Sequence, residues 1–375
     1  MSKSEIIFHE LLKLMVTNKA SDLYVKPFHQ PVLRIEGELY PVKMDELLPN
    51  FTEEVLEFVS TPTQRKNFES NPELNVIYSF DEVKDRFRIN FYKNKGYISL
   101  VVRRINSVIP TIEELNLPVI LKKFVLYKRG LVIVCGATGT GKSTTLASML
   151  DFVNQNYRKH IVTIEDPIEY IIEDKKSYIS QREVGIDTNS FADSLKSVVR
   201  QTPDIVMVGE TRDKITATSI LQLAETGHLI LTTLHSPNTV QAIVRLLQFF
   251  DQSEHREIVN YLASNLIAIV SQRLIPRIDK KGRAPVVEIL IINARMQELL
   301  LDMNFKQMKA EIDSFLTDGM QSFDISLIKL YAKGLISLDT AVEYAEVPHD
   351  LQLKIRTWGI KPGSELPEHL GILAE

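Results

Sequence analysis

Polar and apolar residues alternate along four short stretches in the N-terminal part of the chain, a pattern typical of β-strands with one buried face. The N-terminal segment differs, because Ile7, Leu11 and Leu14 recur at helical spacing and predict an amphipathic helix. Residues 1–105 are therefore predicted to form a small α+β domain with an antiparallel sheet. The four alternating stretches are residues 23–25, 32–35, 86–91 and 98–102.

A segment with two prolines follows this domain. Its sequence, NSVIPTIEELNLP, contains Pro110 and Pro118, and charge is low at both of its ends. The residue before a proline disfavours helical geometry, so a continuous helix is not expected here. We place a linker at residues 106–118.

Four apolar runs rich in β-branched residues come next, and helical patterns separate most of them. Strands that alternate with helices are typical of a parallel sheet covered on both faces, so residues 119–275 are predicted to form an α/β core. Ligands bind beyond the carboxyl ends of the strands in such sheets, which predicts the active site at that edge. The runs are residues 131–135, 161–164, 205–208 and 229–234.

The C-terminal part is predicted to be mainly helical after one further apolar run at residues 286–292. Residues 324–331 and 338–344 predict a helix pair that is interrupted at Gly334. We assign residues 276–356 to a C-terminal strand and helical region, and residues 357–375 to a flexible tail.

The composition narrows the class of protein mainly by exclusion. The chain has 44 Lys and Arg against 48 Asp and Glu, a net charge of −4, so a nucleic-acid partner is not expected. Its single cysteine, Cys135, rules out an internal disulfide and a zinc site built on paired Cys-x-x-Cys, and favours a reducing compartment. No run reaches the ~20 apolar residues of a membrane helix, and the N-terminus lacks the apolar centre of a secretory signal.

The first strand of the core leads into a glycine-rich sequence, GATGTGKST, that fits the P-loop pattern. Glycines let backbone N–H groups curl around phosphate oxygens, and the helix N-terminus adds its dipole. Lys142 is expected to reach the outer phosphates and Ser143 to ligate Mg²⁺. The predicted nucleotide-binding residues are Gly136, Ala137, Thr138, Gly139, Thr140, Gly141, Lys142, Ser143 and Thr144.

Two glutamates, Glu165 and Glu210, each follow an apolar strand at the edge where the P-loop lies. A carboxylate there can orient an attacking water or hold Mg²⁺ through water. We assign the general-base role to Glu210 in preference to Glu165, and we place Glu210 with Ser143 in the predicted metal site.

Two histidines, His228 and His235, flank the run 229–234. A seven-residue extended step separates them by roughly 23 Å, so they cannot share a metal ion. Two interpretations are equally supported: strand-end histidines held by hydrogen bonds, or relays that respond to the nucleotide state.

Arginines gather on two of the N-terminal strands. Arg86 and Arg88 share a face of one predicted strand, and Arg103 and Arg104 close another. Arginines are usually solvated at the surface, and the residues alone favour that interpretation. The alternative is that they reach the γ-phosphate of a neighbouring subunit as arginine fingers.

The motifs together resemble those of a known family. Five segments are similar to the Walker A, Asp box, Walker B and His box series of the secretion-superfamily ATPases, and three others resemble the type IV pilus retraction ATPases, the PilT and PilU family. A further segment, VVRRINSVIPTIEELNLP, is most similar to the PilU branch. The first five are GATGTGKST, IEDPIEY, SQREVGIDT, RQTPDIVMVGETRD and LAETGHLILTTLH, and the next three are ASDLYV, RFRINFYKNKGYISLVVRRI and GMQSFDISL.

This resemblance implies an α/β chain with an N-terminal PAS-like domain, a RecA-like P-loop ATPase domain and a helical C-terminal region. It also implies a ring-shaped homohexamer that binds ATP and Mg²⁺ between subunits. Such a ring docks on the inner-membrane platform protein of the pilus machine, at the cytoplasmic face of the inner membrane, and turns ATP hydrolysis into pilus retraction and twitching motility. A PilT-type ATPase is a further implied partner.

The same resemblance implies roles for individual residues. Glu165 corresponds to the Asp box, Glu210 to Walker B, and His228 and His235 to the His box. Arg88 and Arg103 correspond to the arginines that this family presents across the subunit interface.

The sequence departs from the family pattern at three places. Gly209 stands where an Asp usually precedes the Walker B glutamate, and Tyr24 stands where PilT-type chains carry His. The segment FKQMKAEIDSFL lacks the AIRNLIRE motif of PilT. The last two departures favour the PilU side.

Other functions stay open. The chain could be an ATP-binding accessory subunit that acts through a PilT-type partner, or a pilus extension or type II secretion ATPase. Members of the last two groups commonly carry a zinc insertion with four cysteine ligands, which one cysteine cannot build. A nucleic-acid motor on the same core is disfavoured by the acidic charge balance.

Overall fold

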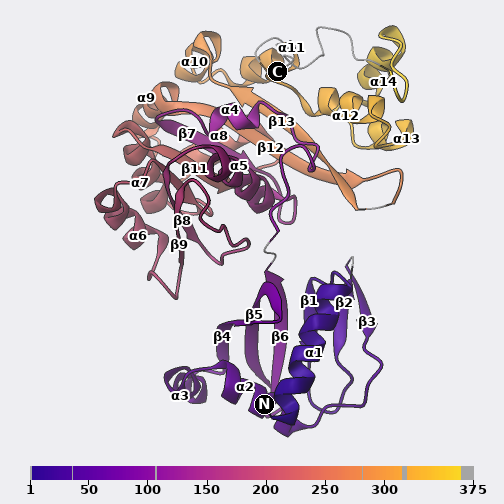
Figure 1. Cartoon of the computed structure of the whole chain (residues 1–375). Helices are drawn as coiled ribbons and strands as arrows, with labels where there is room; N and C mark the ends of the chain where they lie inside the picture. The colour runs from indigo at the N-terminus through magenta and orange to yellow at the C-terminus, as the bar shows by residue number, and fades with distance from the viewer. Residues whose placement is uncertain (1, 36, 106–107, 281, 315–318, 365–375) are drawn as a thin grey trace. The chain divides into compact units, whose positions relative to one another are not determined.

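The computed structural model describes residues 2–35, 37–105, 108–280, 282–314 and 319–364, and the chain divides into two compact units (Figure 1). The first unit comprises Met1–Val108 and Glu169–Ile171, and the second comprises Ile109–Ile168 and Ile172–Glu375. Parts of the predicted linker and tail, residues 106–107 and 365–375, lie outside the described residues.

The first unit is built on a six-stranded antiparallel sheet with the order β3-β2-β1-β6-β5-β4. The predicted α+β architecture is confirmed, while β3, β4, α2 and α3 are additions that the alternation pattern did not predict. The strands are β1 (Asp22–Val25), β2 (Val32–Ile35), β3 (Glu38–Pro41), β4 (Glu73–Phe80), β5 (Val83–Asn94) and β6 (Tyr97–Ile105), and the helices are α1 (Lys3–Thr17), α2 (Pro49–Val59) and α3 (Pro62–Ser70).

The predicted N-terminal helix is confirmed as α1, which begins at a capping box between Ser2 and Glu5. Its buried face differs from the predicted stripe, because Leu14 is exposed while Phe8, Leu12 and Met15 are fully buried. These side chains pack with the inward-facing residues of the sheet, so the core of this unit lies between the sheet and its helices.

The second unit is built on a seven-stranded sheet with the order β13-β12-β7-β11-β10-β8-β9. The strands from β12 to β9 run parallel, and only β13 is antiparallel to its neighbour β12. All four predicted core strands are confirmed as β7, β8, β10 and β11, whereas β9 and β12 were not predicted. The strands are β7 (Gly130–Cys135), β8 (His160–Glu165), β9 (Tyr178–Glu183), β10 (Ile205–Val208), β11 (Leu229–Leu234), β12 (Leu266–Pro276) and β13 (Arg283–Ile291).

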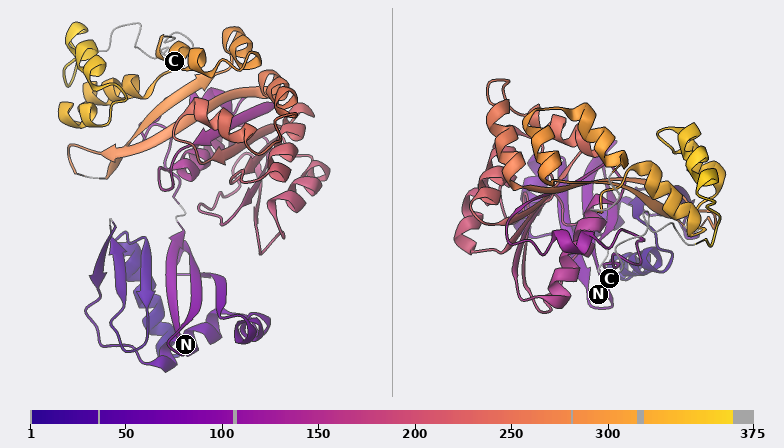
Figure 2. Two further views of the ribbon diagram at one scale, coloured as in Figure 1. Left: turned by 180° about the vertical axis from the view of Figure 1, so that it is seen from behind. Right: turned by 90° about the horizontal axis from the view of Figure 1, so that it is seen from above.

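Helices cover both faces of this sheet, as its view from above shows (Figure 2). Alternate residues of β7 divide between the two cores: Leu131 and Ile133 pack on the side of α6 to α11, and Val132 and Val134 pack on the side of α4 and α5. The covering helices are α4 (Leu121–Phe124), α5 (Lys142–Asn156), α6 (Phe191–Val198) with the 3₁₀ turn η1 (Val199–Gln201), α7 (Lys214–Glu225), α8 (Thr239–Leu247), α9 (His255–Asn265), α10 (Ala294–Leu301) and α11 (Phe305–Ser314).

Three C-terminal helices, α12 (Phe323–Ala332), α13 (Leu338–Glu343) and α14 (Pro348–Thr357), gather beside the β12–β13 hairpin (Figures 1 and 2). They confirm the predicted helix pair, which is interrupted at Gly334 with φ +68°. Their apolar side chains form a separate core with Ile275 of β12 and Val286 of β13. The C-terminal helices are thus joined to the sheet through these two strands.

Candidate functional site

The glycine-rich loop joins β7 to α5 at the carboxyl edge of the sheet. Gly136 has φ +150°, and a Cβ there would lie 2.4 Å from the carbonyl oxygen of Gln272. Gly141 has φ +86°, a region that L side chains rarely adopt. The loop therefore needs glycine at both of its ends. Gly136 is needed because there is no space for a side chain, and Gly141 because of its backbone conformation.

Lys142 lies inside the curve of this loop. Its ammonium donates to the carbonyl oxygens of Gly136, at 3.0 Å, and Ala137, at 2.9 Å, and the side chain is buried. The loop tip at residues 137–139 is exposed. Ser143 and Thr144 follow in the first turn of α5, where the helix dipole and free N–H groups favour an anion. A cation, the exposed loop tip and a helix N-terminus thus lie together, an arrangement suited to an anion such as phosphate.

Glu210 lies just beyond β10, where two hydrogen bonds hold the chain to β11. Thr233 Oγ1 donates to the carbonyl oxygen of Gly209 at 2.7 Å, and the amide of Thr211 donates to the carbonyl oxygen of Thr233 at 3.0 Å. The carboxylate of Glu210 is largely buried, forms an ion pair with Arg212, and has Oε2 3.7 Å from His235 Nε2. Glu210 and His235 therefore form a pair at the same sheet edge as the loop.

Gly209 is explained by the neighbouring strand. A Cβ at this position would lie 3.3 Å from both the Cα of Glu165 and the carbonyl oxygen of Ile164. The strands β8 and β10 approach closely here, so an Asp in place of Gly209 would require the backbone of β8 to shift by a few tenths of an ångström.

Glu165 ends β8 and is buried at the same edge as Glu210. Its Oε1 accepts hydrogen bonds from Thr163 Oγ1 at 2.7 Å and from Gln181 Nε2 at 3.1 Å. These contacts hold the Glu165 carboxylate against its own and the neighbouring strand. The ion pair of Glu210 with Arg212 and its approach to His235 give the two acids different environments.

The two histidines lie at opposite ends of β11. Burial, assisted by the ammonium of Lys142, lowers the pKa of His235, and Glu210 acts in the opposite sense. The imidazole is therefore mainly neutral near pH 7. His228 precedes the strand, and its Nδ1 lies 3.3 Å from the carbonyl oxygen of Leu223 and 3.4 Å from Thr226 Oγ1. Within this chain, the structure brings His235 to the phosphate loop and leaves His228 at the other edge.

The predicted arginines Arg88 and Arg103 lie directly opposite each other on β5 and β6. They continue a charged row across the first unit's sheet, since Arg103 pairs in register with Asp22 of β1, and Asp22 with Arg34 of β2. Asp22 is buried and accepts a hydrogen bond from Arg103 Nε at 2.9 Å. Arg88 and Arg103 thus share the sheet face that does not carry the core.

The other two arginines diverge from this row. Arg104 points to the opposite face, where its guanidinium forms an ion pair with the buried Asp85 at 2.8 Å. Arg86 is exposed and lies two residues from Arg88 on the same strand face.

Two residues of the site were missed by sequence reasoning. Arg212 forms the ion pair with Glu210, and its position two residues after that glutamate was the available signal. Gln272 of β12 accepts a hydrogen bond from Thr145 Oγ1 at 2.7 Å, and its amide nitrogen would lie 3.0 Å from a Cβ on Gly141. Gln272 is a buried polar residue within an apolar strand, and these contacts place its side chain against the end of the phosphate loop and the first turn of α5.

A phosphate loop between the first strand and helix of a parallel sheet, with a glutamate beyond a neighbouring strand, defines a P-loop nucleoside-triphosphate-binding protein. Comparison with known proteins makes this class specific. Residues 101–315 match the family described as Type II/IV secretion system protein.

Two relatives from Pseudomonas aeruginosa cover nearly the whole chain. The chain is 42% identical to "Type IV pilus ATPase PilU", over 98% of this chain and 95% of that protein. It is 37% identical to "Type IV pilus retractation ATPase PilT", over 91% of this chain and 98% of that protein. The chain belongs to the type II/IV secretion family and, within it, to the type IV pilus ATPases.

A solved structure supports the same conclusion for the fold. The crystal structure of the pilus retraction motor PilT with bound ADP matches with a TM-score of 0.85 and 36% identity, covering 94% of this chain and 99% of that one. The predicted fold class is thereby confirmed: an N-terminal domain, a RecA-like ATPase domain and a helical C-terminal region. In the part of the chain that the structure describes, no helix is long and apolar enough to cross a bilayer.

Proposed function

We propose that this chain is an ATP-hydrolysing motor of type IV pilus retraction, of the PilU type. One observation carries the proposal: Lys142 lies inside the phosphate loop, and the Glu210–His235 pair lies at the same sheet edge, in a chain 42% identical to a pilus ATPase over 98% of its length. The site thus has a group for binding phosphates and a group for activating water.

ATP would bind with its phosphates in the loop of residues 136–141. Lys142 Nζ now donates to two loop carbonyl oxygens, and these hydrogen bonds can be exchanged for charge-assisted ones to the outer phosphates. The exposed loop tip leaves its backbone N–H groups open to the ligand.

Magnesium fits the oxygen groups of this edge. Ser143 supplies a hydroxyl in the first turn of α5, and Glu210 supplies a carboxylate that can act through water. The described residues hold no cluster of three or more His, Cys, Asp or Glu suited to a metal. Mg²⁺ is commonly bound by one or two carboxylates together with the phosphates of the substrate. When bound, Mg²⁺ would neutralise charge on the β- and γ-phosphates.

Glu210 is our proposed general base. It orients the attacking water and accepts its proton, while Arg212 forms an ion pair with the carboxylate and His235, neutral near pH 7, lies 3.7 Å from it. Glu165 is proposed to support this edge, since its carboxylate already has two hydrogen-bond donors.

Arg88 and Arg103 are proposed to act across subunits of a homohexamer. Like charges directly opposite each other on neighbouring strands destabilise a sheet, and Asp22 is paired with Arg103 and Arg34. The row holds more arginine side chains than this single aspartate can pair. It is therefore suited to bind an anion from outside the subunit, such as the γ-phosphate of ATP bound by a neighbouring subunit. His228 is proposed to lie at the same interface.

The ring would work at the cytoplasmic face of the inner membrane, on the platform protein of the pilus machine. An ATPase assay of the purified chain, with Glu210→Gln as control, tests the enzyme. Measuring pilus retraction with and without a PilT-type ATPase then separates a motor from an accessory subunit. ATP binding without turnover, combined with retraction that depends wholly on the partner, would favour the accessory function.

A further inference from the structure

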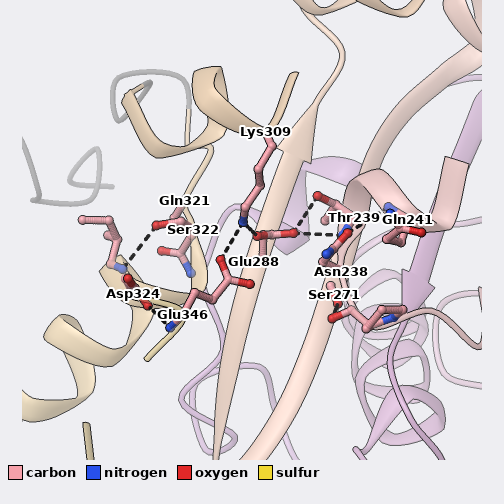
Figure 3. A network of polar contacts seen from close by, with 12 residues as sticks. Asn238, Thr239, Gln241, Ser271, Glu288, Lys309, Gln321, Ser322, Asp324 and Glu346 are labelled. Carbon is pink, nitrogen blue, oxygen red and sulfur yellow. Dashed lines mark hydrogen bonds and ion pairs between the residues drawn. The ribbon is translucent and has the colours of Figure 1, made fainter. Parts of the chain in front are cut away.

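The loop of residues 235–238, which carries His235 into the site, is held at its far end by β12 and β13. The carbonyl oxygen of Pro237 accepts hydrogen bonds from Ser271 Oγ and from Arg273 Nη2, each at 3.4 Å. Immediately after the loop, Thr239 donates its amide and its hydroxyl to Glu288 Oε1, at 2.9 and 2.8 Å. Figure 3 shows this Glu288–Thr239 contact at the start of α8.

Two of the three residues that hold the loop, Arg273 and Glu288, are themselves connected by a chain of ion pairs. Arg273 Nη2 lies 3.3 Å from Glu346 Oε1, and Lys309 Nζ lies 2.7 Å from Glu346 Oε2. Lys309 also reaches Glu288 Oε2 at 2.5 Å, so charges alternate along the series. Figure 3 shows Lys309 between Glu288 and Glu346. We name Arg273, Glu346, Lys309 and Glu288 the charge clamp.

The charge clamp and the loop together form a closed ring of contacts. It begins on Pro237 through Arg273 and returns to Thr239 through Glu288, so both sides of Asn238 are held. Asn238 itself accepts a weak hydrogen bond from the thiol of Cys135, at 3.7 Å, next to the phosphate loop. The loop between His235 and α8 is therefore fixed by groups outside the strand that carries it.

Helix α11 and the C-terminal helices together supply half of the charge clamp. Lys309 comes from α11, and Glu346 lies between α13 and α14, where its amide donates to Asp324 Oδ1 of α12 at 2.8 Å. A displacement of these helices would therefore change the contacts of Glu288 and Arg273 with the loop.

Because Glu288 is buried, the charge clamp is sensitive to the loss of the charge on any of its residues. Glu288 is 0% exposed, and a carboxylate so placed depends on its partners. Burial by itself would lower the pKa of Lys309, but the carboxylates of Glu288 and Glu346 outweigh burial and raise it. Lys309 therefore stays charged and neutralises Glu288.

We propose that Glu288 and Arg273 are positioning residues for ATP hydrolysis, and that Lys309 and Glu346 make the alignment of His235 depend on α11 and the C-terminal helices. This inference rests on the proposed ATPase function. The charge clamp fixes the position of the loop of residues 235–238, and the position of this loop determines the distance between His235 and Glu210.

The test compares three variants with the wild-type assembly. Lys309→Met leaves the buried Glu288 without its cation, whereas the double variant Lys309→Met with Glu288→Gln removes both charges and keeps an oxygen that accepts from Thr239. Lys306→Met is the matched control, because Lys306 lies exposed on the same helix. The readouts are kcat and KM for ATP, the Kd of a fluorescent ADP analogue, and the melting temperature.

We expect Lys309→Met to lower kcat by about tenfold to a hundredfold, as small misplacements of catalytic groups do, with KM and ADP affinity within about twofold of wild type. The double variant should recover kcat to within roughly threefold, and Lys306→Met should match wild type. Should Lys309→Met fail to assemble, the partly exposed Glu346→Gln tests the same charge clamp and should lower kcat without changing KM.

A purely structural role predicts a different result. It would lower the melting temperature of Lys309→Met while kcat of the folded assembly stayed at the wild-type value, which would overturn the inference. A double variant as slow as Lys309→Met would overturn it as well. If wild type itself fails to hydrolyse ATP but binds it, the proposed function fails instead, and the two failures are thereby distinguished.

Discussion

His235 Nε2 lies 3.7 Å from Glu210 Oε2, although the two residues follow different strands of the sheet. The contact arises because β10 and β11 are parallel neighbours whose carboxyl ends meet at one edge. Burial and Lys142 lower the pKa of His235, so the pair consists of a carboxylate and a mainly neutral ring. This arrangement suits a base that must keep its negative charge to accept a proton from water.

Lys142→Ala should weaken ATP binding by about a hundredfold, because a hydrogen bond to a charged group contributes on the order of 1.5–3 kcal/mol. The ammonium is the cation that the loop encloses, and it donates to the carbonyl oxygens of Gly136 and Ala137 in that loop. Titration calorimetry with ATP measures the effect. An unchanged affinity would show that the phosphates bind elsewhere.

Glu210→Gln should keep ATP bound and lower turnover on the order of 10²- to 10⁴-fold, since a general base is needed for hydrolysis and not for binding. Glu165→Gln is the matched comparison, because Glu165 ends a neighbouring strand at the same edge. Single-turnover kinetics measures both. If Glu165→Gln lost turnover while Glu210→Gln kept it, the two roles would have to be exchanged.

Subunits with Arg88→Ala and Arg103→Ala should assemble and bind ATP but hydrolyse it poorly, since an arginine finger contributes on the order of 10³- to 10⁵-fold in rate. Arg86→Ala, on the same face of β5, is the control and should retain activity. The steady-state ATPase rate of the assembled variants measures this effect.

Mixing the double arginine variant with Glu210→Gln subunits should restore some turnover, because a mixed ring places intact arginines against an intact glutamate. Native mass spectrometry verifies that mixed rings form. A mixture as inactive as either parent would contradict action across the subunit interface.

Acidification should destabilise the first unit through His9. This buried ring stacks on Phe80 at 4.2 Å and lies 2.6 Å from the Tyr78 hydroxyl, and burial lowers its pKa below the ordinary value of 6.5. The unfolded chain therefore binds a proton first as the pH falls below 6.5, so stability is lost in that direction.

His9→Gln cannot titrate and should reduce this loss. Melting temperatures at about pH 7.5 and about pH 5.5 measure the difference, with the exposed His29→Gln as control. An equal loss in wild type and in His9→Gln would assign the acid sensitivity to other groups.

Cys135 should be inert in the folded chain. Its side chain is buried at the end of β7, and burial raises the pKa of the thiol to about 12, so almost no thiolate is present at neutral pH. The thiol reagent DTNB should label the denatured chain completely and the native chain only at the rate of opening. Rapid, complete labelling of the native chain would contradict this burial.

Motif and periodicity alone determined the phosphate loop, the four central strands and the two acids at their ends. These features are encoded in contiguous residues: glycine spacing permits the loop, and continuous apolar runs mark strands covered on both faces. The same reasoning missed β12, because α9 ends at Asn265 and the strand begins at Leu266 without a glycine or proline between them. It missed β9 because that edge strand, YISQRE, is mostly polar.

Only the tertiary structure decided which distant residues meet. Strand register sets Arg88 opposite Arg103 and separates Arg104 onto the other face, since successive side chains of a strand alternate. The support of the phosphate loop by Gln272 likewise depends on which strand lies beside β7.

The charge clamp is the clearest case. Nothing in the sequence distinguishes Glu288 and Lys309 from other charged residues. In the folded chain Glu288 is buried, so its carboxylate depends on the ammonium of Lys309 for a balancing charge. Local sequence patterns carry the chemistry of single groups, whereas the distances between groups arise from strand order, register and helix packing.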